Sequence, residues 1–511
     1  MGALDKYSGS WTTSHVVHLY HRATYGASIS QIKAGATGGL DYCTNLLFKS
    51  NPLPAPPINA NYTLDPFVPI GQTWVNQPAV QGVNGYRTIS LRAWAMENIL
   101  TNQLSITEKM VVFWHNHFVT ADINDPRMSY EYIQLLRKHA LGNFKTMTEE
   151  ITIDPAMLNY LNGRDNTRRA PNENYARELM ELFTLGKGAL AGPGDYTTFT
   201  ELDVKEIARA LTGWIELRDV APIVAEYREA RHDLSSKTLS HRFNNVVIEN
   251  NGANEYKDVI RIIFDRIEVS EFIVTKFYKW FVTTSVTDDA KVNVIQPLAK
   301  KFREDNYEIK NVLQILLSSN HFYESCHLGA LVKDPIAFVV NPLNTFSAAI
   351  PTNLADKYRY MTLLYGSAFI LQMGMFQCPA VAGWQPTYQE PLYSKLWLNS
   401  HTLPTRKKYT DAIVVTAQTD QNFDFLSLLA QVSDPSDYKL VVSELTSYVF
   451  AFPLTENQVD VLSELLIPLN WTQVYNNYVA DPNNTTKQTP LINRMRNLLI
   501  YIMRMPEFHL F

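Results

Sequence analysis

The stretch PNENYARELMELFTLGKG, residues 171–188, is the most informative part of this 511-residue sequence. Pro171 suits an early helical position and Gly186 suits the position just after a helix, so the stretch predicts a helix over about 172–185. At about 100° per residue, the charged and amide side chains fall on one face of this helix and the large apolar side chains on the other. The pattern therefore predicts an amphipathic helix.

Helical spacing continues outward from this stretch. Apolar residues recur at intervals of three and four over most of 86–153 and 254–375. Two other segments interrupt the pattern: 51–85 is rich in proline, and 376–408 mixes proline, glycine and aromatic residues. We therefore expect a mainly α fold, a large multi-helix globular body with long ordered loops and few or no strands. Short strands are expected at most near 216–250.

Two residue pairs have the spacing of a helix-capping box. Ser105 is followed by Glu108, and Thr200 is followed by Asp203. In such a box the first side chain binds a backbone N–H of the first turn, and the acidic side chain reaches back. Both pairs therefore predict a helix start.

The composition describes a globular protein with little charge. Charged residues make up 19% of the sequence and aromatic residues 12%, and 50 acidic against 45 basic residues leave a net charge of −5. Binding to a polyanion needs clustered Lys and Arg, so we expect no nucleic-acid partner. The chain is also too hydrophobic and too weakly charged for a disordered protein.

The cysteines and the first residues bear on the cellular compartment. Cys43, Cys326 and Cys378 lie far apart, and predict neither a disulfide framework nor a structural zinc site. The start, MGALDKYSGSWT, lacks the apolar core of a signal peptide, which favours a cytoplasmic location and leaves an unusual export route open. The longest apolar run, LLIYIM at 498–503, is too short for a transmembrane helix.

The charged face of the predicted 172–185 helix has two interpretations. Glu173, Arg177 and Glu181 follow one another at i,i+4 spacing and fit ordinary ion pairs on a helix surface. Glutamates on one helix face also supply metal ligands or an acid–base pair in carboxylate sites, and Glu178 lies on the same face. Helical periodicity does not separate the two alternatives.

Histidines provide the other candidates. In FWHNHF, residues 113–118, His115 and His117 would point about 200° apart on a helix and could not bind one ion, whereas on a strand they would share a face. They fit either a core histidine with a surface or capping histidine, or a functional imidazole tuned near neutral pH. The pair His232-Asp233 fits either a metal or acid–base role or ordinary loop residues.

The signatures of several common enzyme classes are missing. The sequence has no GxSxG elbow, Walker A loop, GxGxxG fingerprint, EF-hand loop or HExxH zinc motif. The glycine-rich GKGALAG follows a predicted helix rather than preceding one, so it lacks the context of a phosphate-binding loop.

Taken together, the motifs resemble a bacterial family described as domain of unknown function 1800. The matching segments occur in family order over nearly the whole chain: HRATYGAS (21–28), KMVVFWHNHF (109–118), DPAMLNYLNG (154–163), APNENYARELMELFTLGKG (170–188), DVKEIARALTGW (203–214), HDLSSKTL (232–239), KDPIAFVV (333–340), PAVAGWQ with WLNSHTLPTR (379–406) and MPEFHLF (505–511).

The resemblance implies little chemistry, because the family has no established activity. It implies a companion protein that resembles sulfatase or phosphatase folds. It also implies that many members are exported, although this sequence shows no export signal. It also gives weight to the candidate residues, since the family segments coincide with them.

Because the resemblance runs from end to end, it implies a single α-helical unit over residues 1–511. Its sub-regions are N-terminal helices in 1–50, a Pro-rich wrap in 51–85, a motif-bearing helical core in 86–252, a helical region in 253–375, a Pro/aromatic loop in 376–408 and C-terminal helices in 409–511.

Two functions from different classes follow as hypotheses. The first is a metal-assisted or acid–base hydrolase, with a pocket formed by FWHNHF, the 172–185 helix and the His232-Asp233 loop. Its catalytic candidates are Glu178, Glu181, His115 and Arg177, and its candidate ligands for a divalent metal ion are His117, Glu173, His232 and Asp233. The second is a non-catalytic assembly or partner-binding protein with a structural, buried ion-pair network. Under this hypothesis the partner is either another protein or a second copy of the chain.

Overall fold

The computed structural model describes residues 2–101, 104–415 and 423–511. The helices before the middle of the chain are α1 Thr13–Ala23, α2 Ile29–Leu47, α3 Asn84–Thr101, α4 Thr107–His117, α5 Pro126–Lys138, α6 Phe144–Thr152, α7 Pro155–Tyr160, α8 Asn174–Glu178, α9 Glu201–Ala210 and α10 Glu255–Phe264. Those that follow are α11 Ile267–Phe281, α12 Asp288–Ala290, α13 Gln296–Glu304, α14 Ile309–Ser318, α15 Pro335–Thr345, α16 Leu354–Ile370, α17 Gln385–Tyr388, α18 Thr402–Val415, α19 Phe425–Leu429, α20 Tyr438–Ser447, α21 Glu456–Ser463, α22 Trp471–Ala480 and α23 Thr485–Ile502.

Strands are few and short in the described residues. They form three antiparallel two-stranded sheets: β1 Leu190–Gly192 with β2 Asp195–Tyr196, β3 Trp214–Leu217 with β4 Val224–Tyr227, and β5 Lys237–Thr238 with β6 Val247–Ile248. The expectation of a mainly α fold is therefore confirmed.

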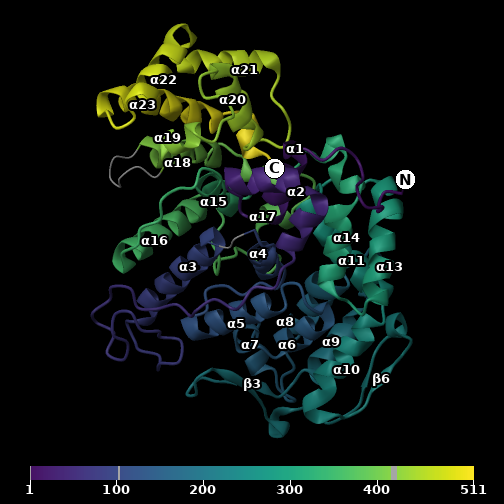
Figure 1. The fold of residues 1–511 in the computed structure, drawn as a ribbon. Helices are drawn as coiled ribbons and strands as arrows, with labels where there is room; N and C mark the ends of the chain where they lie inside the picture. Colours follow the sequence, from purple (N-terminus) through teal and green to yellow (C-terminus); the bar gives the residue numbers. More distant parts are fainter. Residues whose placement is uncertain (1, 102–103, 416–422) are drawn as a thin grey trace.

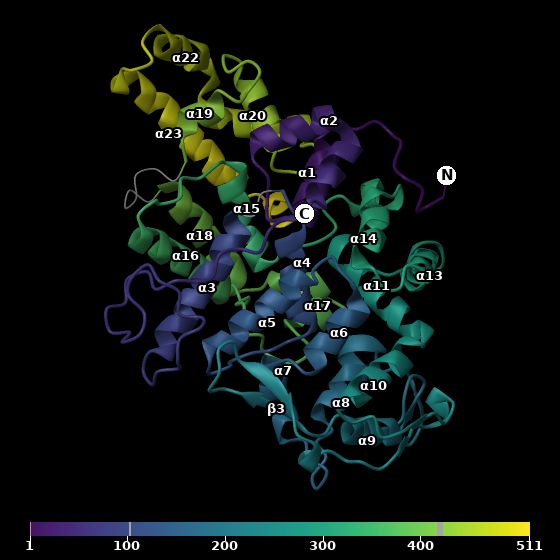
Figure 2. The same cartoon turned by 60° about the horizontal axis from the view of Figure 1, so that its bottom comes forward.

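Different parts of the chain form the two ends of the molecule. Figures 1 and 2 show α19–α23 at one end of the molecule and α5–α10, with the small sheets, at the other. Helices α11, α13 and α14 run along one side, and α3 packs against α16, which follows it by more than 250 residues. The C-terminus lies in the middle, near α1, in both views.

The two predicted capping boxes have different outcomes. Thr200 and Asp203 form a complete box at the start of α9. At α4, by contrast, the helix begins at Thr107 after an N-cap residue without a side-chain cap, and Glu108 is bound at both carboxylate oxygens by Arg137 of α5, at 2.6 and 2.8 Å. Ser105 Oγ still accepts from the backbone N–H of Thr107 at 3.2 Å, so the buried ion pair has replaced only the glutamate half of the box.

The Pro-rich segment 51–85 is an ordered wrap over α3. Trp74 is buried and donates its indole N–H to Ser90 of α3 at 3.1 Å. Asp65 forms a fully buried ion pair with Arg87 of the same helix at 2.9 Å. Burying a carboxylate requires such a partner, so this pair fixes where the segment lies.

An ion pair joins several distant elements at the centre of the molecule. The Lys109 ammonium of α4 lies 2.8 Å from Asp334, the N-cap residue of α15, and both side chains are buried. The ring centroids of Tyr25, Trp280 and Phe511 lie 4.7, 5.4 and 4.8 Å from Lys109 Nζ. Burial lowers the pKa of Lys109, and the Asp334 charge opposes that effect. Carboxylate and ring faces together replace the water that the ammonium gives up.

None of the described helices combines the length and the apolar character that a membrane crossing needs.

The central ion pair makes a prediction about stability. Lys109→Ala leaves Asp334 buried without its partner, so the free energy of unfolding should fall by about 3–5 kcal/mol, measured by urea denaturation. The double variant Lys109→Met with Asp334→Asn removes both charges and keeps a residue that can cap α15, so it should recover part of the loss. A double variant no more stable than Lys109→Ala would show that the charge pair is not what stabilises this region.

Candidate functional site

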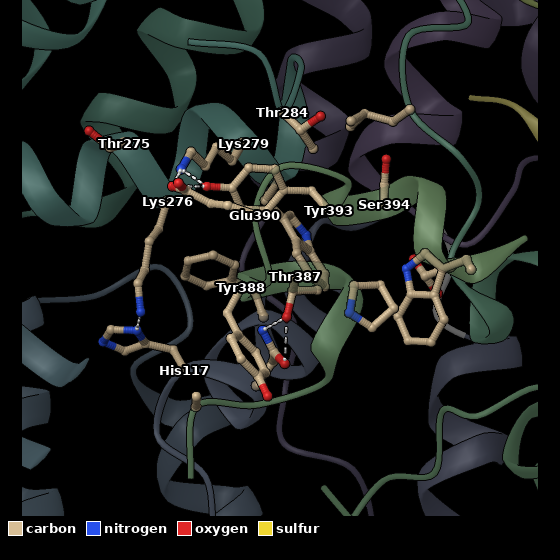
Figure 3. A pocket seen from close by; sticks show the side chains of 18 of the residues that line it. His117, Thr275, Lys276, Lys279, Thr284, Thr387, Tyr388, Glu390, Tyr393 and Ser394 are labelled. Atoms are coloured by element: carbon tan, nitrogen blue, oxygen red, sulfur yellow. Dashed lines mark hydrogen bonds and ion pairs between the residues drawn. The ribbon is translucent and has the colours of Figure 1, made fainter. Parts of the chain in front are cut away.

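A cavity of about 390 Å³ lies beside α4 and α11, beneath the loop 376–408 (Figure 3). Much of its wall is apolar, from Phe113, Leu182, Phe272, Trp280, Val332, Trp397 and Phe511. The groups that can carry chemistry come from His117, Glu181, Lys276, Lys279, Glu390 and Tyr393. A mostly apolar cavity with a few convergent polar groups is typical of a small-molecule site.

The segment FWHNHF forms the last turns of α4, so its neighbouring side chains point in different directions. Trp114 donates its indole N–H to the carbonyl of Ala140 and packs in the core. His115 and His117 contact different parts of the chain, as expected for residues two apart on a helix. The segment therefore serves both the packing of the core and the wall of the cavity.

His115 faces the 376–408 loop and does not line the cavity. Its Nε2 accepts a hydrogen bond from the backbone N–H of Phe376 at 3.2 Å, and its Nδ1 lies 3.6 Å from Cys378 Sγ. Its ring stacks on Trp384. Burial lowers the pKa of His115 to about 4, so the imidazole is neutral at physiological pH. These contacts favour the core alternative for His115, an anchor for the loop.

Asn116 holds the same loop in place. Its side-chain oxygen accepts from the backbone N–H of Trp384 at 2.8 Å, and its amide group donates to Thr387 at 2.9 Å. Gly383 has φ of +97°, and a Cβ atom there would lie 2.4 Å from Asn116 Oδ1 and 2.6 Å from the Asn116 carbonyl oxygen. Only glycine allows so close an approach. The segments FWHNHF and PAVAGWQ therefore pack directly against each other.

His117 points into the cavity and holds a lysine (Figure 3). Its Nδ1 lies 2.9 Å from Lys276 Nζ and accepts its hydrogen, so Nε2 carries the ring proton and donates to the carbonyl of Phe183 at 3.0 Å. Lys276 also donates to the carbonyl of Leu182 at 3.1 Å. Burial, and then the charge of Lys276, hold the pKa of His117 well below its usual range.

Lys276 lines the cavity together with Lys279, Glu390 and Tyr393, and no sequence motif singles out any of these four residues. Burial lowers the pKa of the Lys276 amine to about 7, with a smaller contribution from the neighbouring charge of Lys279. Both lysines lie on the cavity face of α11, one turn apart. On the sequence alone they look like the solvated face of an amphipathic helix, because the partner of Lys276 lies 159 residues away.

A second polar group lies across the cavity from His117 (Figure 3). Lys279 Nζ donates to Tyr393 Oη at 2.7 Å, and Tyr393 in turn donates to the carboxylate of Glu390. Burial lowers the pKa of Lys279. Burial, and then the contact with Glu390, raise the pKa of Tyr393, so the phenol keeps its proton.

The predicted 172–185 helix is interrupted where it meets the cavity. It consists of α8 followed by a π-helix over Leu179–Thr184, and Gly186 follows with φ of +77°. The carbonyls that bind Lys276 and His117 both belong to this π-helix. π-Helical turns are rare and often occur at functional sites. Helical periodicity could not predict this turn, because tertiary contacts select it.

The charged face of that helix divides between two environments. Arg177 binds Glu201 of α9 at both carboxylate oxygens, at 2.7 and 2.8 Å, and Glu173 at 3.2 Å, in an ion-pair cluster at the surface. Glu181 lines the cavity, with one oxygen bound by Lys187 and the other, Oε2, without a hydrogen-bond partner among the described residues. Burial, and then Glu181, raise the pKa of Glu178.

His232 and Asp233 belong to other networks. His232 is fully buried and its Nε2 lies 2.9 Å from Glu255, which also binds the buried Lys237 at 2.6 Å. Asp233 pairs with Arg209 of α9 at 2.8 Å. The common pocket expected for FWHNHF, the 172–185 helix and this loop therefore includes His117 and Glu181 but neither His232 nor Asp233.

The comparison with protein families gives the same relationship as the motifs. The family described as Protein of unknown function (DUF1800) matches residues 18–510. The chain belongs to the DUF1800 family. Neither the curated proteins nor the solved structures contain a match, so the function of this DUF1800 chain has to be argued from its site.

Several segments that resemble the family converge on the cavity. Its lining includes Lys109 and His117 from the 109–118 segment and Glu181 from 170–188. Asp334, Trp397 and Phe511 come from 333–340, 379–406 and 505–511. The segments that resemble the family thus contribute much of the lining of this cavity.

The docking of the loop can be tested at Gly383. Gly383→Ala should lower the free energy of unfolding by about 1–3 kcal/mol and make 376–408 more sensitive to limited proteolysis, because the Cβ atom collides with Asn116. Gly366→Ala in α16 is the matched control: a Cβ there meets nothing within 4 Å, so alanine should stabilise the helix by about 0.5–1 kcal/mol. Equal effects of both substitutions in urea denaturation would contradict the close contact.

Proposed function

We propose that this DUF1800 chain is an acid–base enzyme of hydrolase type that acts on a small molecule in the cavity. The observation that supports this most is the amine of Lys276, held at the cavity wall between His117 and the carbonyl of Leu182. The four metal ligands expected from the sequence, His117, Glu173, His232 and Asp233, belong to separate networks. We therefore propose the acid–base form of the hypothesis, and the metal-assisted form stays a prediction.

Lys276 has the properties of a group that exchanges a proton near neutral pH. With a pKa of about 7, the amine is present in both protonation states at physiological pH. Two of its hydrogens point to His117 and Leu182, so the remaining tetrahedral position holds the lone pair or the third hydrogen. A base works best when its pKa lies near the working pH. The neutral amine takes a proton from water or from the bound substrate, and His117 is its positioning residue.

The opposite wall suits an oxygen that gains negative charge. Lys279 lines the cavity and donates one of its hydrogens to Tyr393, so its other N–H groups are available to a substrate carbonyl oxygen. Tyr393, whose own hydrogen goes to Glu390, holds Lys279 in place. Preorganised donors of this kind stabilise the oxyanion of an acyl-transfer reaction. The free oxygen of Glu181 in the same lining is a second candidate base.

The walls suggest the substrate class. Phe272, Trp280 and Trp397 offer apolar surface, and about 390 Å³ of space accommodates a molecule of small-drug size at most. We therefore favour a short-chain ester or amide, with its apolar part against the rings and its carbonyl between the two lysines.

The proposal predicts a lysine-dependent hydrolysis. In a panel of p-nitrophenyl esters and anilides of short acyl chains, at least one compound should be hydrolysed, with a rate that rises with pH around a midpoint near 7. The rate rises because only the neutral amine of Lys276 accepts a proton. Lys276→Met should lower kcat/KM by about 10²–10⁴-fold, the usual contribution of a general base.

The matched control is Lys300→Met, at an exposed lysine of α13, which should leave the rate unchanged. A panel without any turnover, or full turnover in Lys276→Met with the same pH profile, would contradict the proposed function.

A further inference from the structure

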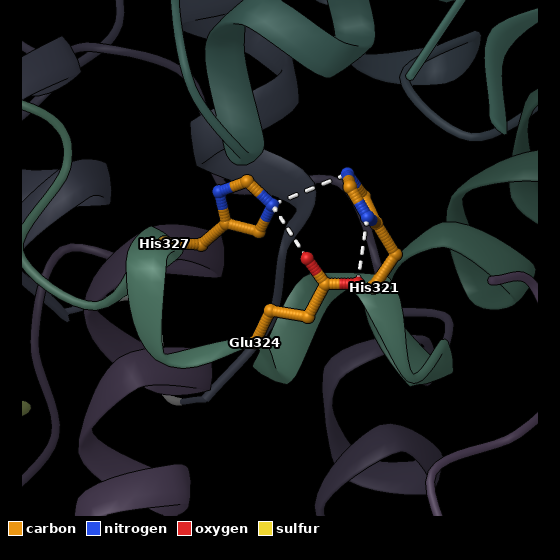
Figure 4. Close-up of side chains that lie close together, drawn as sticks. All are labelled: His321, Glu324 and His327. Atoms are coloured by element: carbon orange, nitrogen blue, oxygen red, sulfur yellow. Dashed lines mark hydrogen bonds and ion pairs between the residues drawn. The ribbon is translucent and has the colours of Figure 1, made fainter. Parts of the chain in front are cut away.

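Three side chains outside the cavity lie together after α14 (Figure 4). They are His321, Glu324 and His327, the one set of three or more His, Cys, Asp or Glu residues in the described ranges whose ligand atoms all lie within 4.8 Å of one another. Two single 3₁₀ turns, His321–Tyr323 and Ser325–His327, carry the histidines, and Glu324 connects the turns in an extended conformation. This geometry brings the three side chains together, and His321 Nδ1 lies 3.1 Å from Glu324 Oε1.

The distances within the set suit a metal ion. His327 Nε2 lies 3.2 Å from His321 Nε2 and 3.7 Å from Glu324 Oε2. Zinc binds imidazole nitrogen and carboxylate oxygen at about 2.0–2.2 Å, which places neighbouring ligand atoms of a tetrahedron about 3.3–3.5 Å apart. A single hydrogen shared between the two imidazoles also satisfies these nitrogens, and a metal ion bound between them replaces that hydrogen.

Neighbouring groups fix the orientation of the ligands. Tyr278 Oη lies 3.0 Å from His321 Nε2, where it can contact an ion or an ion-bound water. Arg22 donates to the backbone carbonyl of His327 at 2.8 Å and to the carbonyls of Phe281 and Val282, so the buried guanidinium holds the second turn against the end of α11. Such outer contacts orient metal ligands in proteins.

Glu324 is the most exposed member of this set. The two histidines are buried, whereas the Glu324 side chain is 49% exposed. An ion can therefore enter past the carboxylate and then lie between the two imidazoles. Two histidines and one glutamate also leave at least one coordination position for water, as in zinc sites of that ligand set.

We propose that His321, Glu324 and His327 bind one divalent transition-metal ion of the zinc type, with an open position toward solvent. These residues differ from the cavity-lining ones and from the metal ligands expected on sequence grounds. The inference does not depend on the proposed hydrolase activity.

Metal titration tests this site directly. The full chain, treated with a chelator and dialysed, is titrated with zinc chloride by calorimetry and with cobalt chloride by visible absorption. Wild type should bind one ion per chain with high affinity, and the cobalt form should show the intense visible bands of low coordination number. Glu324→Gln should weaken binding at least about 10-fold, and His321→Ala with His327→Ala should weaken it at least about 100-fold.

The control substitution is His241→Ala, which removes an exposed imidazole and should leave zinc affinity unchanged. Circular dichroism verifies that each variant is folded, and Glu324→Gln keeps the test decisive if the double histidine variant is not. Zinc binding to wild type no tighter than to Glu324→Gln, or an equal loss in His241→Ala, would overturn the proposal. The ester panel in zinc-free buffer separates a failure of this site from a failure of the lysine site.

Discussion

The arrangement of this chain depends on one buried ion pair, Lys109 with Asp334. An ammonium in a protein interior needs both a counter-charge and a replacement for its hydration shell, and here these come from four distant parts of the sequence. The pair joins α4 to the start of α15, and the surrounding rings bring in the end of α1, α11 and the last residue. Both charged residues also line the cavity, so the contact that organises the core also forms part of the candidate site.

The two long irregular segments are also held in place by buried polar contacts to helices. The 376–408 loop is fixed to α4 by His115 and Asn116, and the 51–85 wrap is fixed to α3 by Asp65 and Trp74. Pro-rich and aromatic segments of this kind can also bind a neighbouring chain, and the hypothesis of an assembly protein stays a prediction. In the structure their buried polar groups are used within the chain, and the loop covers a cavity.

The sequence predicted what depends on local pattern. Helical spacing predicted the fold class, and the capping box at Thr200 formed because both partners are local. The helix start predicted from Ser105 and Glu108 is also present, since α4 begins at Thr107, but Glu108 binds Arg137 of α5 instead of capping α4. For the site, the motif led to His117 and Glu181, and both line the cavity. Lys276 could not be found, because its significance comes from burial against a π-helix.

Lys276 has a pKa close to neutrality because its amine is largely withdrawn from water at the cavity wall, with the charge of Lys279 nearby. This pKa can be measured by nuclear magnetic resonance of lysine ¹³Cε in selectively labelled chain over about pH 5–11, with the Lys276 signal assigned from its absence in Lys276→Arg. The Lys276 signal should titrate with a midpoint near 7 in wild type and with a higher midpoint in Lys279→Met, which lacks the neighbouring charge. A Lys276 signal that titrates near 10.4, together with the exposed lysines, would contradict it.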